Sequence, residues 1–383
     1  MKIAFDAKRA VRNFTGLGNY SRLVIEKLAA AYPADELTLF SPELRPNPRL
    51  DAIRSLPQVK FRLPEKGECR LGKSAWRTWG ISAILRHEGF DLYHGLSNEL
   101  PLNIAASGIP SVVTVHDVIY RRLPYCYSVI DRAVYDYKYG RACRNATRII
   151  AISQRTSLDI QQLYDIDPAK IDIIYQGCHA SFSEPWSPEK LDDLRRRYNL
   201  PARFVLQVGT IEKRKNLMLT LQALPMLPPD VELIAVGRDR LGYRAEVERE
   251  ARKLGVHHRL RFLEGIPFGD LPGLNRAASA VAYPSRYEGF GLPVIEAIES
   301  GTAVVAATGS CLEEAGGPGA IYVNPDDATA MAKALDAIIS DASRRKRMVV
   351  EGQAHTVRFK GSGMAAGIHA TYERAIAEFH SKR

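Results

Sequence analysis

The chain has 383 residues, of which 46% are hydrophobic and 25% are charged. This composition is that of a globular protein and excludes a long disordered or fibrous region, while the length favours two domains over one. The formal net charge of +10 suits nucleic acid, anionic lipid or a phosphate-bearing substrate, and charge alone does not choose among these partners.

The chain carries no predicted targeting or membrane-spanning segment. Its opening residues, MKIAFDAKRAV, lack an apolar stretch of signal-peptide length, and no later stretch approaches the roughly 20 apolar residues of a transmembrane helix. The five cysteines are scattered and include no CxxC pair, which argues against a zinc ribbon and against a disulfide framework. We therefore expect a cytoplasmic protein.

Short apolar strands alternate with helical stretches through the first half of the chain. Helical periodicity is found near 20–31, 75–88 and 130–145. Apolar, β-branched runs predict strands over 2–8, 37–40, 59–63, 90–94, 111–117, 147–153 and 170–175. This alternation is typical of βαβ units and a parallel sheet.

The alternation breaks at SFSEPWSPEKL (181–191), where prolines and serines predict a domain boundary. It restarts with strands expected over 203–209, 231–237, 260–265, 280–285, 303–308 and 320–323. We therefore predict an N-terminal domain over 1–185 and a second domain over 190–362. The helical stretch 364–383 follows the complete second sheet, so we expect it to pack back on the first domain.

Basic residues cluster in the first half, around Arg70, Lys73 and Arg77 and again at Arg121 and Arg122. They form either a solvated helical face or a patch for a membrane surface or an anionic acceptor. No basic helix interleaved with aromatic residues and no known nucleic-acid module is present in the sequence. We expect no nucleic-acid partner.

The segment YPSRYEGFGLPVIEAIESGTAVVAA (283–307) predicts a strand, a glycine-containing loop, a short helix and another strand. Pro293 suits the first helical position and Gly301 the position past the helix end, so the helix is expected over 293–299. Its first turn would aim N–H groups of Gly291, Leu292 and Val294 into the loop. With the helix dipole, these groups would favour a phosphate or a developing negative charge.

Two glutamates stand eight positions apart in this segment, Glu288 in the loop and Glu296 inside the helix. They can serve as two contacts along an elongated ligand, Glu288 near its reacting end and Glu296 accepting from hydroxyls such as those of a ribose. The alternative is structural, with Glu288 capping a turn and Glu296 exposed on an amphipathic helix.

The run EGFGLPVIE, from Glu288 to Glu296, resembles the Glu-plus-seven-plus-Glu motif of retaining GT-B glycosyltransferases, in particular glycosyltransferase family 4. The resemblance extends along most of the chain. It implies an α/β fold of two Rossmann-like parallel-sheet domains facing a central crevice. It also implies that Glu288 contacts the transferred sugar, that Glu296 contacts the ribose, and that the backbone of Phe290, Gly291 and Leu292 meets sugar and diphosphate.

A second signal is VGTIEKRKNL (208–217), where a strand-to-helix turn bears adjacent cations that could neutralise a diphosphate. The alternative is a solvated helix start. The resemblance implies that Lys215 contacts the diphosphate. Many family members place an arginine where this chain has Thr210, and Arg214 is a candidate to replace it.

The N-terminal loop NFTGLGNYSR (13–22) contains a Gly-x-Gly but lacks the third small residue of a dinucleotide fingerprint. The resemblance implies that Gly16, Leu17 and Gly18 lie beside the transferred sugar. A purely structural turn is the alternative.

A histidine at the carboxyl end of a parallel strand faces the position where α/β proteins bind ligands. His116, in TVHDV (114–118), is better placed for this than His94, although His94 also ends a predicted strand. The resemblance implies that His116 contacts the donor sugar.

Two patterns that suggest metal binding have simpler structural readings. Asp165 and Asp167 have the Asp-x-Asp spacing of another glycosyltransferase fold, but they lie in a polar turn before Pro168. His257 and His258 have no partner at metal-ligand spacing. We expect no metal site and no cofactor besides the donor.

The resemblance implies a retaining, metal-independent hexosyltransferase that uses a GDP- or UDP-linked sugar, with GDP-mannose as first choice. Base selection is expected in the loop around Gly265 and Ile266. The implied acceptor is a glycan or lipid-linked saccharide of bacterial polysaccharide or lipopolysaccharide synthesis, handled in the cytoplasm or peripherally at the inner membrane face. Two alternatives remain: a nucleotide-sugar epimerase of the same architecture, and a non-catalytic partner that binds a nucleotide sugar.

Overall fold

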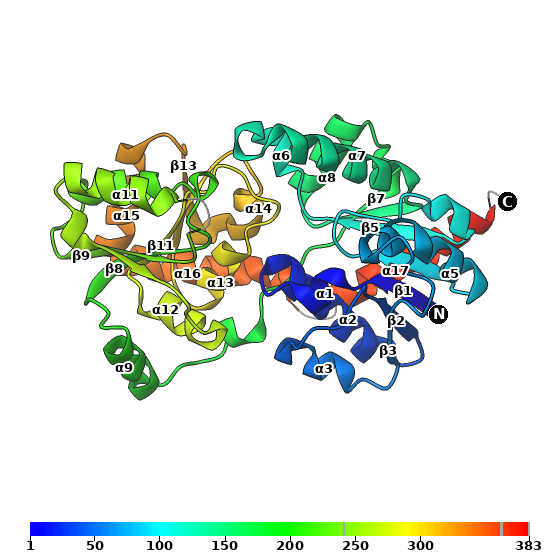
Figure 1. Cartoon of the computed structure of the whole chain (residues 1–383). Helices are drawn as coiled ribbons and strands as arrows, with labels where there is room; N and C mark the ends of the chain where they lie inside the picture. The colour runs from blue at the N-terminus through cyan, green and yellow to red at the C-terminus, as the bar shows by residue number, and fades with distance from the viewer. Residues whose placement is uncertain (240–241, 361–362, 382–383) are drawn as a thin grey trace. The chain divides into compact units, whose positions relative to one another are not determined.

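The computed structural model describes residues 1–239, 242–360 and 363–381. These residues divide into two compact units, each a parallel sheet flanked by helices (Figure 1). The first unit holds Met1–Gln176 together with the C-terminal helix α17 (Gly363–Ser381), and the second holds Gly177–Lys360.

The first unit contains a seven-stranded sheet in the order β3-β2-β1-β4-β5-β6-β7, with every neighbouring pair parallel. Its strands are β1 (Lys2–Asp6), β2 (Glu36–Phe40), β3 (Val59–Arg62), β4 (Leu92–Gly95), β5 (Ser111–Val115), β6 (Arg148–Ala151) and β7 (Ile171–Ile173). Besides α17, its α-helices are α1 (Lys8–Arg12), α2 (Gly16–Ala31), α3 (Asp51–Arg54), α4 (Lys73–Ala75), α5 (Ile81–His87), α6 (Ile119–Arg122), α7 (Val129–Asn145) and α8 (Gln154–Tyr164).

The second unit contains a six-stranded parallel sheet in the order β10-β9-β8-β11-β12-β13. Its strands are β8 (Arg203–Val208), β9 (Val231–Val236), β10 (Leu260–Leu263), β11 (Ala280–Tyr283), β12 (Val304–Ala307) and β13 (Ala320–Val323). Its α-helices are α9 (Pro188–Arg197), α10 (Leu217–Ala223), α11 (Tyr243–Lys253), α12 (Leu271–Ala277), α13 (Leu292–Glu299), α14 (Leu312–Gly316), α15 (Ala328–Ser340) and α16 (Ala342–Thr356).

Every strand expected from the sequence is present in one of the two sheets, which confirms the predicted α/β class. The central strands read as continuous apolar runs because helices cover both faces of a parallel sheet. β5 and β12, for example, are buried along their whole length.

Strand order reverses once in each sheet. In the first sheet the reversal lies between β1 and β4, and in the second it lies between β8 and β11. Loops that leave the carboxyl ends of such a strand pair diverge to opposite faces and open a crevice, which is where open α/β sheets bind ligands. The loops after β8 and β11 are those that carry the two strongest sequence motifs.

Helix α17 completes the first unit by packing against α2, β5 and β6. Its buried residues include Ile368 and Tyr372, and the Tyr372 hydroxyl lies 2.6 Å from His94 Nδ1 on β4. The stretch 181–191 lies inside the second unit, where Trp186 and Leu191 pack against its core.

Two helices differ from the sequence prediction. α2 begins at Gly16, earlier than expected, because the chain turns into a helix directly after Thr15. The helix expected over 75–88 is divided into α4, a π-helical segment at Trp76–Gly80, and α5. The π-segment buries Trp76 and leaves Trp79 exposed, a separation that a regular helical period does not predict.

Candidate functional site

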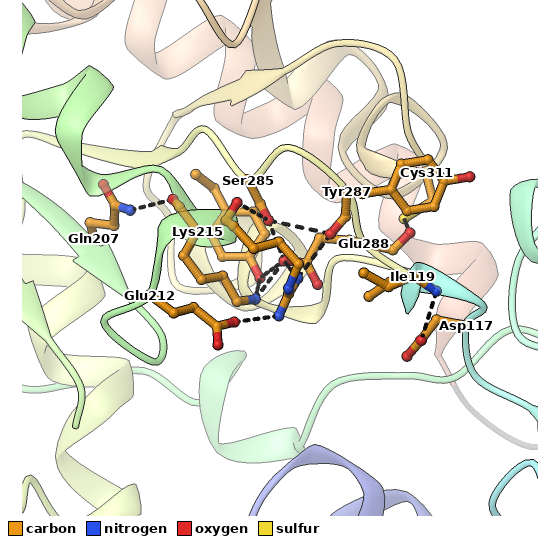
Figure 2. A network of polar contacts seen from close by, with 11 residues as sticks. Asp117, Ile119, Gln207, Glu212, Lys215, Ser285, Tyr287, Glu288 and Cys311 are labelled. Carbon is orange, nitrogen blue, oxygen red and sulfur yellow. Dashed lines mark hydrogen bonds and ion pairs between the residues drawn. The ribbon is translucent and has the colours of Figure 1, made fainter. Parts of the chain in front are cut away.

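The candidate site of the second unit is built around Glu288. Two cations from the loop after β8 approach its carboxylate, together with one hydroxyl group at the end of β11 and one in the loop that follows β11. Lys215 Nζ lies 2.5 Å and Arg214 Nη1 2.8 Å from Glu288 Oε1. The Tyr283 hydroxyl lies 3.2 Å and Ser285 Oγ 2.5 Å from the same oxygen. Figure 2 shows Lys215, Ser285 and Glu288 pointing toward one another.

The fold brings these residues together at the reversal of strand order in the second sheet. Arg214 and Lys215 belong to the turn after β8, and Glu288 belongs to the loop after the neighbouring strand β11. A backbone hydrogen bond of 2.9 Å, from Arg286 N–H to the Arg214 carbonyl, ties the two loops to each other. The cations and the carboxylate therefore share one rigid corner at the edge of the sheet.

The charges in this corner shift each other's protonation. Burial alone would raise the pKa of Glu288, but Arg214, Lys215 and the hydrogen-bond donors outweigh it and hold the pKa at about 2. Burial lowers the pKa of Lys215, while Glu288 beside it acts in the opposite direction. At neutral pH the glutamate is a carboxylate whose basicity is much reduced.

Helix α13 begins at Leu292, one residue before the predicted start at Pro293, and ends at Glu299 as predicted. Gly291 precedes it with a φ of 100°, a left-handed conformation that glycine adopts at low cost. A Cβ atom on Gly291 would lie 2.7 Å from Leu312 Cδ2, so the position has no room for a side chain either. The expectation for Val294 is wrong, because its N–H donates to the Gly291 carbonyl at 3.0 Å.

The remaining motif residues are distributed along the loop and α13. Phe290 is buried and meets Phe359 edge to face, with ring centroids 5.2 Å apart. Leu292 and Glu296 are half-buried. Burial raises the pKa of Glu296 to about 7, so this carboxyl group exchanges its proton near neutrality, unlike Glu288.

The guanidinium of Arg214 takes part in several contacts within this corner. Its guanidinium donates to Glu288, to the Tyr287 carbonyl at 2.8 Å and to Glu212 at 2.7 Å. Thr210 lies at the end of β8 and is half-buried. Arg214 is thus tied to its own loop and to the loop of Glu288.

The loop after β10 carries Gly265 and Ile266. Gly265 is exposed with a φ of 70°, and Ile266 packs partly against the core of the second unit. An open backbone beside an anchored apolar side chain could lie against a flat ring such as a nucleotide base. No described contact joins this loop to Glu288.

In the first unit, Gly16, Leu17 and Gly18 form the first turn of α2 instead of a loop. Gly18 has a structural reason to be glycine, because a Cβ atom there would lie 1.8 Å from the Asn13 carbonyl oxygen. Gly16 is exposed and has nothing within 4 Å of its Cβ position. Its backbone is therefore open to a ligand.

His116 directly follows β5 and is buried. Its Nε2 lies 2.9 Å from the Leu96 carbonyl, which fixes Nε2–H as a donor and leaves Nδ1 as an acceptor. Burial lowers the pKa of His116 to about 4, so the ring is neutral at physiological pH. Tyr20, in α2, meets the ring edge to face at 4.6 Å and so connects His116 to the helix that begins with Gly16.

His94 is a core residue. Its two ring nitrogens lie 2.6 Å from the Tyr372 hydroxyl and 2.8 Å from Thr114 Oγ1, and burial lowers its pKa to about 3. Both ring nitrogens therefore have partners within the first unit.

The polar residues that suggested metal binding in the sequence lie in turns. Asp165 ends α8 in a left-handed conformation, and Asp167 Oδ1 accepts from the Ala169 N–H at 2.8 Å. His257 and His258 are exposed on a single 3₁₀ turn. Within the described ranges, no three His, Cys, Asp or Glu side chains gather closely enough to hold a metal ion.

Most of the clustered basic residues of the first unit are paired. Arg77 lies 2.5 Å from Asp6 and 2.7 Å from Glu99, and Arg121 and Arg122 pair with Asp136 and Asp159. Arg77 is therefore not part of a solvated face. In the part of the chain that the structure describes, no helix is both long and apolar enough to cross a bilayer.

Sequence reasoning missed Tyr283 and Ser285, which also contact Glu288. Tyr283 ends an apolar strand, where an aromatic residue suggests core packing, and Ser285 suggests a turn. The available signal was their place in the chain: both precede Glu288 by five residues or fewer, at the carboxyl end of the strand that borders the reversal in strand order.

Two family models match the chain, one in each half. Residues 14–182 match the model described as Glycosyltransferase Family 4, and residues 192–355 match the model described as Glycosyl transferases group 1. The two matches include all the site residues described above, from Gly16 to Glu296.

Two curated relatives match over nearly the full length of both chains. O-antigen chain mannosyltransferase B of Escherichia coli is 28% identical over 384 residues, covering 94% of this chain and 96% of that protein. MMP alpha-(1->4)-mannosyltransferase of Mycolicibacterium hassiacum is 26% identical over 421 residues, covering 98% and 99%.

Among solved structures, HepE from Anabaena, in complex with UDP and glucose, superposes with a TM-score of 0.73 and 22% identity over the whole of both chains. At this identity the likeness shows the fold. Together with the two parallel sheets, it establishes the GT-B fold that the sequence motif implied.

Proposed function

Because the chain belongs to the glycosyltransferases of family 4 and group 1, we propose that it transfers a hexose from a nucleoside-diphosphate sugar to a glycan or lipid-linked acceptor, with retention of anomeric configuration. The donor binds mainly to the second unit and the acceptor to the first. The observation that carries this proposal is the corner of Lys215, Arg214 and Glu288 beside the start of α13.

Departure of a diphosphate requires positive charge at the oxygen that leaves. Lys215 and the first turn of α13 lie at the same end of the sheet, so both can act on one diphosphate. Phe290, Gly291 and Leu292 supply the backbone that meets the sugar and phosphates, and Glu296 accepts from ribose hydroxyls. With these groups the transfer does not require a metal ion, and activity should persist in EDTA.

The bonding of Glu288 favours a front-face reaction. A double displacement requires a carboxylate that attacks the anomeric carbon. Glu288 is a poor nucleophile because four donors crowd one of its oxygens and its pKa is about 2. We propose instead that the acceptor oxygen bonds to the anomeric carbon while the bond to the phosphate oxygen breaks on the same face. The acceptor proton passes to that phosphate oxygen, which yields a nucleoside diphosphate.

In the first unit, His116 and the first turn of α2 contact the transferred sugar. His116 Nδ1 is the ring atom left to accept a hydrogen bond from a sugar hydroxyl group. The exposed backbone at Gly16 allows the sugar to approach closely. The neutral ring of His116 means that this contact does not change between pH 6 and 8.

GDP-mannose is the proposed donor, since both full-length relatives are named as mannosyltransferases. A UDP sugar is the alternative, because the Anabaena structure contains UDP and glucose. Gly265 and Ile266 are the proposed contacts to the base. Relatives in O-antigen synthesis suggest a surface polysaccharide or lipopolysaccharide acceptor.

Thermal shift against GDP, UDP, GDP-mannose and UDP-glucose, followed by NMR of the product, tests the proposal. We expect stabilisation by one nucleotide, a retained anomeric configuration in the product, and loss of transfer in Glu288→Ala. An inverted product would refute the mechanism. Altered nucleotide sugar without acceptor would indicate an epimerase, and unchanged glycan synthesis with Glu288→Ala in cells would indicate a non-catalytic partner.

We also propose a peripheral contact with an anionic membrane, in keeping with a lipid-linked acceptor. Along α7 the side chains of Ile130, Val134 and Tyr137 are exposed, and Arg141 continues the same helical face. Exposed Arg70 lies elsewhere in the first unit. Co-sedimentation with phosphatidylglycerol vesicles should exceed that with phosphatidylcholine, and Ile130→Asp with Val134→Asp should abolish it.

A further inference from the structure

Two buried hydroxyl groups support Glu288 and have no assigned role in the proposed reaction. Tyr283 is the last residue of β11, and Ser285 follows it by two positions. Both side chains are almost fully buried, at 2% and 1% exposure. Neither can reach far into solvent, so each acts through the groups that it contacts in this corner.

All the described contacts of the Glu288 side chain end on one oxygen. Lys215, Arg214, Tyr283 and Ser285 each approach Oε1. None of the described hydrogen bonds ends on Oε2, and the side chain keeps 11% of its exposure. One carboxylate oxygen is therefore held by the protein while the other is available to a ligand.

Ser285 contributes a short bond directed at this carboxylate. Its Oγ lies 2.5 Å from Glu288 Oε1, whereas its next acceptor, the Arg214 carbonyl, lies 3.3 Å away. A hydroxyl carries one proton, so the carboxylate is the acceptor that it serves. Among the described hydrogen bonds of Ser285 Oγ, none joins it to Lys215 Nζ or to the Arg214 guanidinium.

Tyr283 joins the carboxylate to the lysine. Its hydroxyl accepts from Lys215 Nζ at 2.6 Å and donates to Glu288 Oε1 at 3.2 Å. Burial raises the pKa of Tyr283 well above its ordinary value, so the phenol keeps its proton at any working pH. Lys215 also lies over the Tyr283 ring, 4.9 Å from its centroid.

We propose that Tyr283 and Ser285 are positioning residues, which fix Oε1 of Glu288 so that Oε2 faces the transferred sugar. Ser285 acts on the carboxylate alone, and Tyr283 acts on the carboxylate and on the lysine together. This inference rests on the proposed function of Glu288 and Lys215 in sugar transfer.

Ser285→Ala is the sharper test because it changes one bond of Glu288. We expect kcat for transfer to fall about 10- to 100-fold, as for a misplaced reacting group, while the affinity for the nucleoside diphosphate stays within about twofold. Ser285→Thr, which keeps a hydroxyl, should restore most of kcat. Ser183→Ala is the matched control, since Ser183 Oγ lies 2.5 Å from Glu299 Oε2 in the same unit but away from Glu288.

Tyr283→Phe should lower both kcat and nucleoside-diphosphate affinity, because Lys215 loses an acceptor that helps to hold it. Tyr322→Phe is the matched control, since the Tyr322 hydroxyl donates to the Gly317 carbonyl at 2.8 Å and lies outside this network. If Tyr283 had a purely structural role, Tyr283→Phe and Tyr322→Phe would both lower thermal stability, and both would leave kcat unchanged.

A direct readout of Glu288 separates this inference from the proposed function. In the wild type the pKa of Glu288 is about 2, and a carbon-13 NMR titration of the carboxyl group should show it rise in Ser285→Ala and not in Ser183→Ala. The absence of a rise, or a Ser285→Ala variant that transfers as well as Ser183→Ala, would overturn the inference. Failure of the wild type to bind GDP or UDP would refute the proposed function instead, and the titration would still decide whether Ser285 holds Glu288.

Discussion

Lys215 Nζ lies 2.5 Å from Glu288 Oε1, and the two side chains keep only 14% and 11% of their exposure. In the absence of a donor the lysine is thus neutralised by a carboxylate of the same unit. A diphosphate that enters this corner competes with Glu288 for Lys215. The lysine then exchanges one anionic partner for another, and its charge does not have to be desolvated again.

Lys215→Ala should therefore reduce transfer strongly while the fold remains intact. Arg214 still faces Glu288 at 2.8 Å, so the carboxylate is not left without a cation. We expect kcat/KM to fall about 10²- to 10³-fold, the usual effect of removing one group that stabilises developing charge. Lys213→Ala is the control, because Lys213 is exposed and pairs with Glu246; equal losses in both variants would contradict the assignment.

Glu296 should make the folded protein less stable as the pH rises, which is opposite to the effect of a carboxyl group in a salt bridge. Its pKa is raised from 4.5 to about 7, so between these values the folded protein keeps a proton that the unfolded chain loses. Stability from this group is present below pH 4.5 and is lost as pH rises toward 7. The Tm difference between Glu296→Gln and wild type should grow in favour of the variant from pH 5 to pH 8. A difference that stays constant would show that Glu296 does not titrate in this range.

Gly291→Ala should destabilise the second unit and weaken nucleotide binding. An alanine would need a φ of 100° and would bring its Cβ to 2.7 Å from Leu312. We expect a loss of about 1–3 kcal/mol of unfolding free energy by urea denaturation. Gly269→Ala, in an open position, is the control and should change stability by less than about 1 kcal/mol.

Tyr372→Phe tests the attachment of α17 to the first sheet. The variant leaves His94 Nδ1 buried without its partner at 2.6 Å, which should cost about 1–3 kcal/mol. Hydrogen exchange should speed up in β4 and α17, while the thermal shift caused by nucleotide stays as in the wild type. An unchanged exchange rate in β4 would mean that the bond contributes nothing to stability.

The fold was largely predictable because parallel strands leave a strong pattern. The buried strand β5 is rich in β-branched residues and β12 is wholly apolar, and the segment around Pro293 and Gly301 carries the start and stop signals of α13. These signals are local, so one sequence suffices to read them.

The site was less predictable because its chemistry depends on partners far apart in the sequence. Lys215 and Glu288 were both expected near a ligand, but nothing in the sequence shows that they bind each other. Tyr283 ends an apolar strand and so suggests core packing, because its contact with Lys215 cannot be read from the sequence. Arg77 was expected on a surface, although it pairs with Asp6 and Glu99. Val294 was misjudged because the turn that consumes its N–H depends on the left-handed Gly291.

The position of α17 has a consequence for synthesis on the ribosome. The helix that fills the first unit, and that brings Tyr372 to His94, is encoded after every strand of the second unit. If the N-terminal unit began to fold first, as is usual, it would do so without α17. All of the second sheet is synthesised before α17, so β5 and β6 of the first sheet gain the helix that packs on them only after the second unit has left the ribosome.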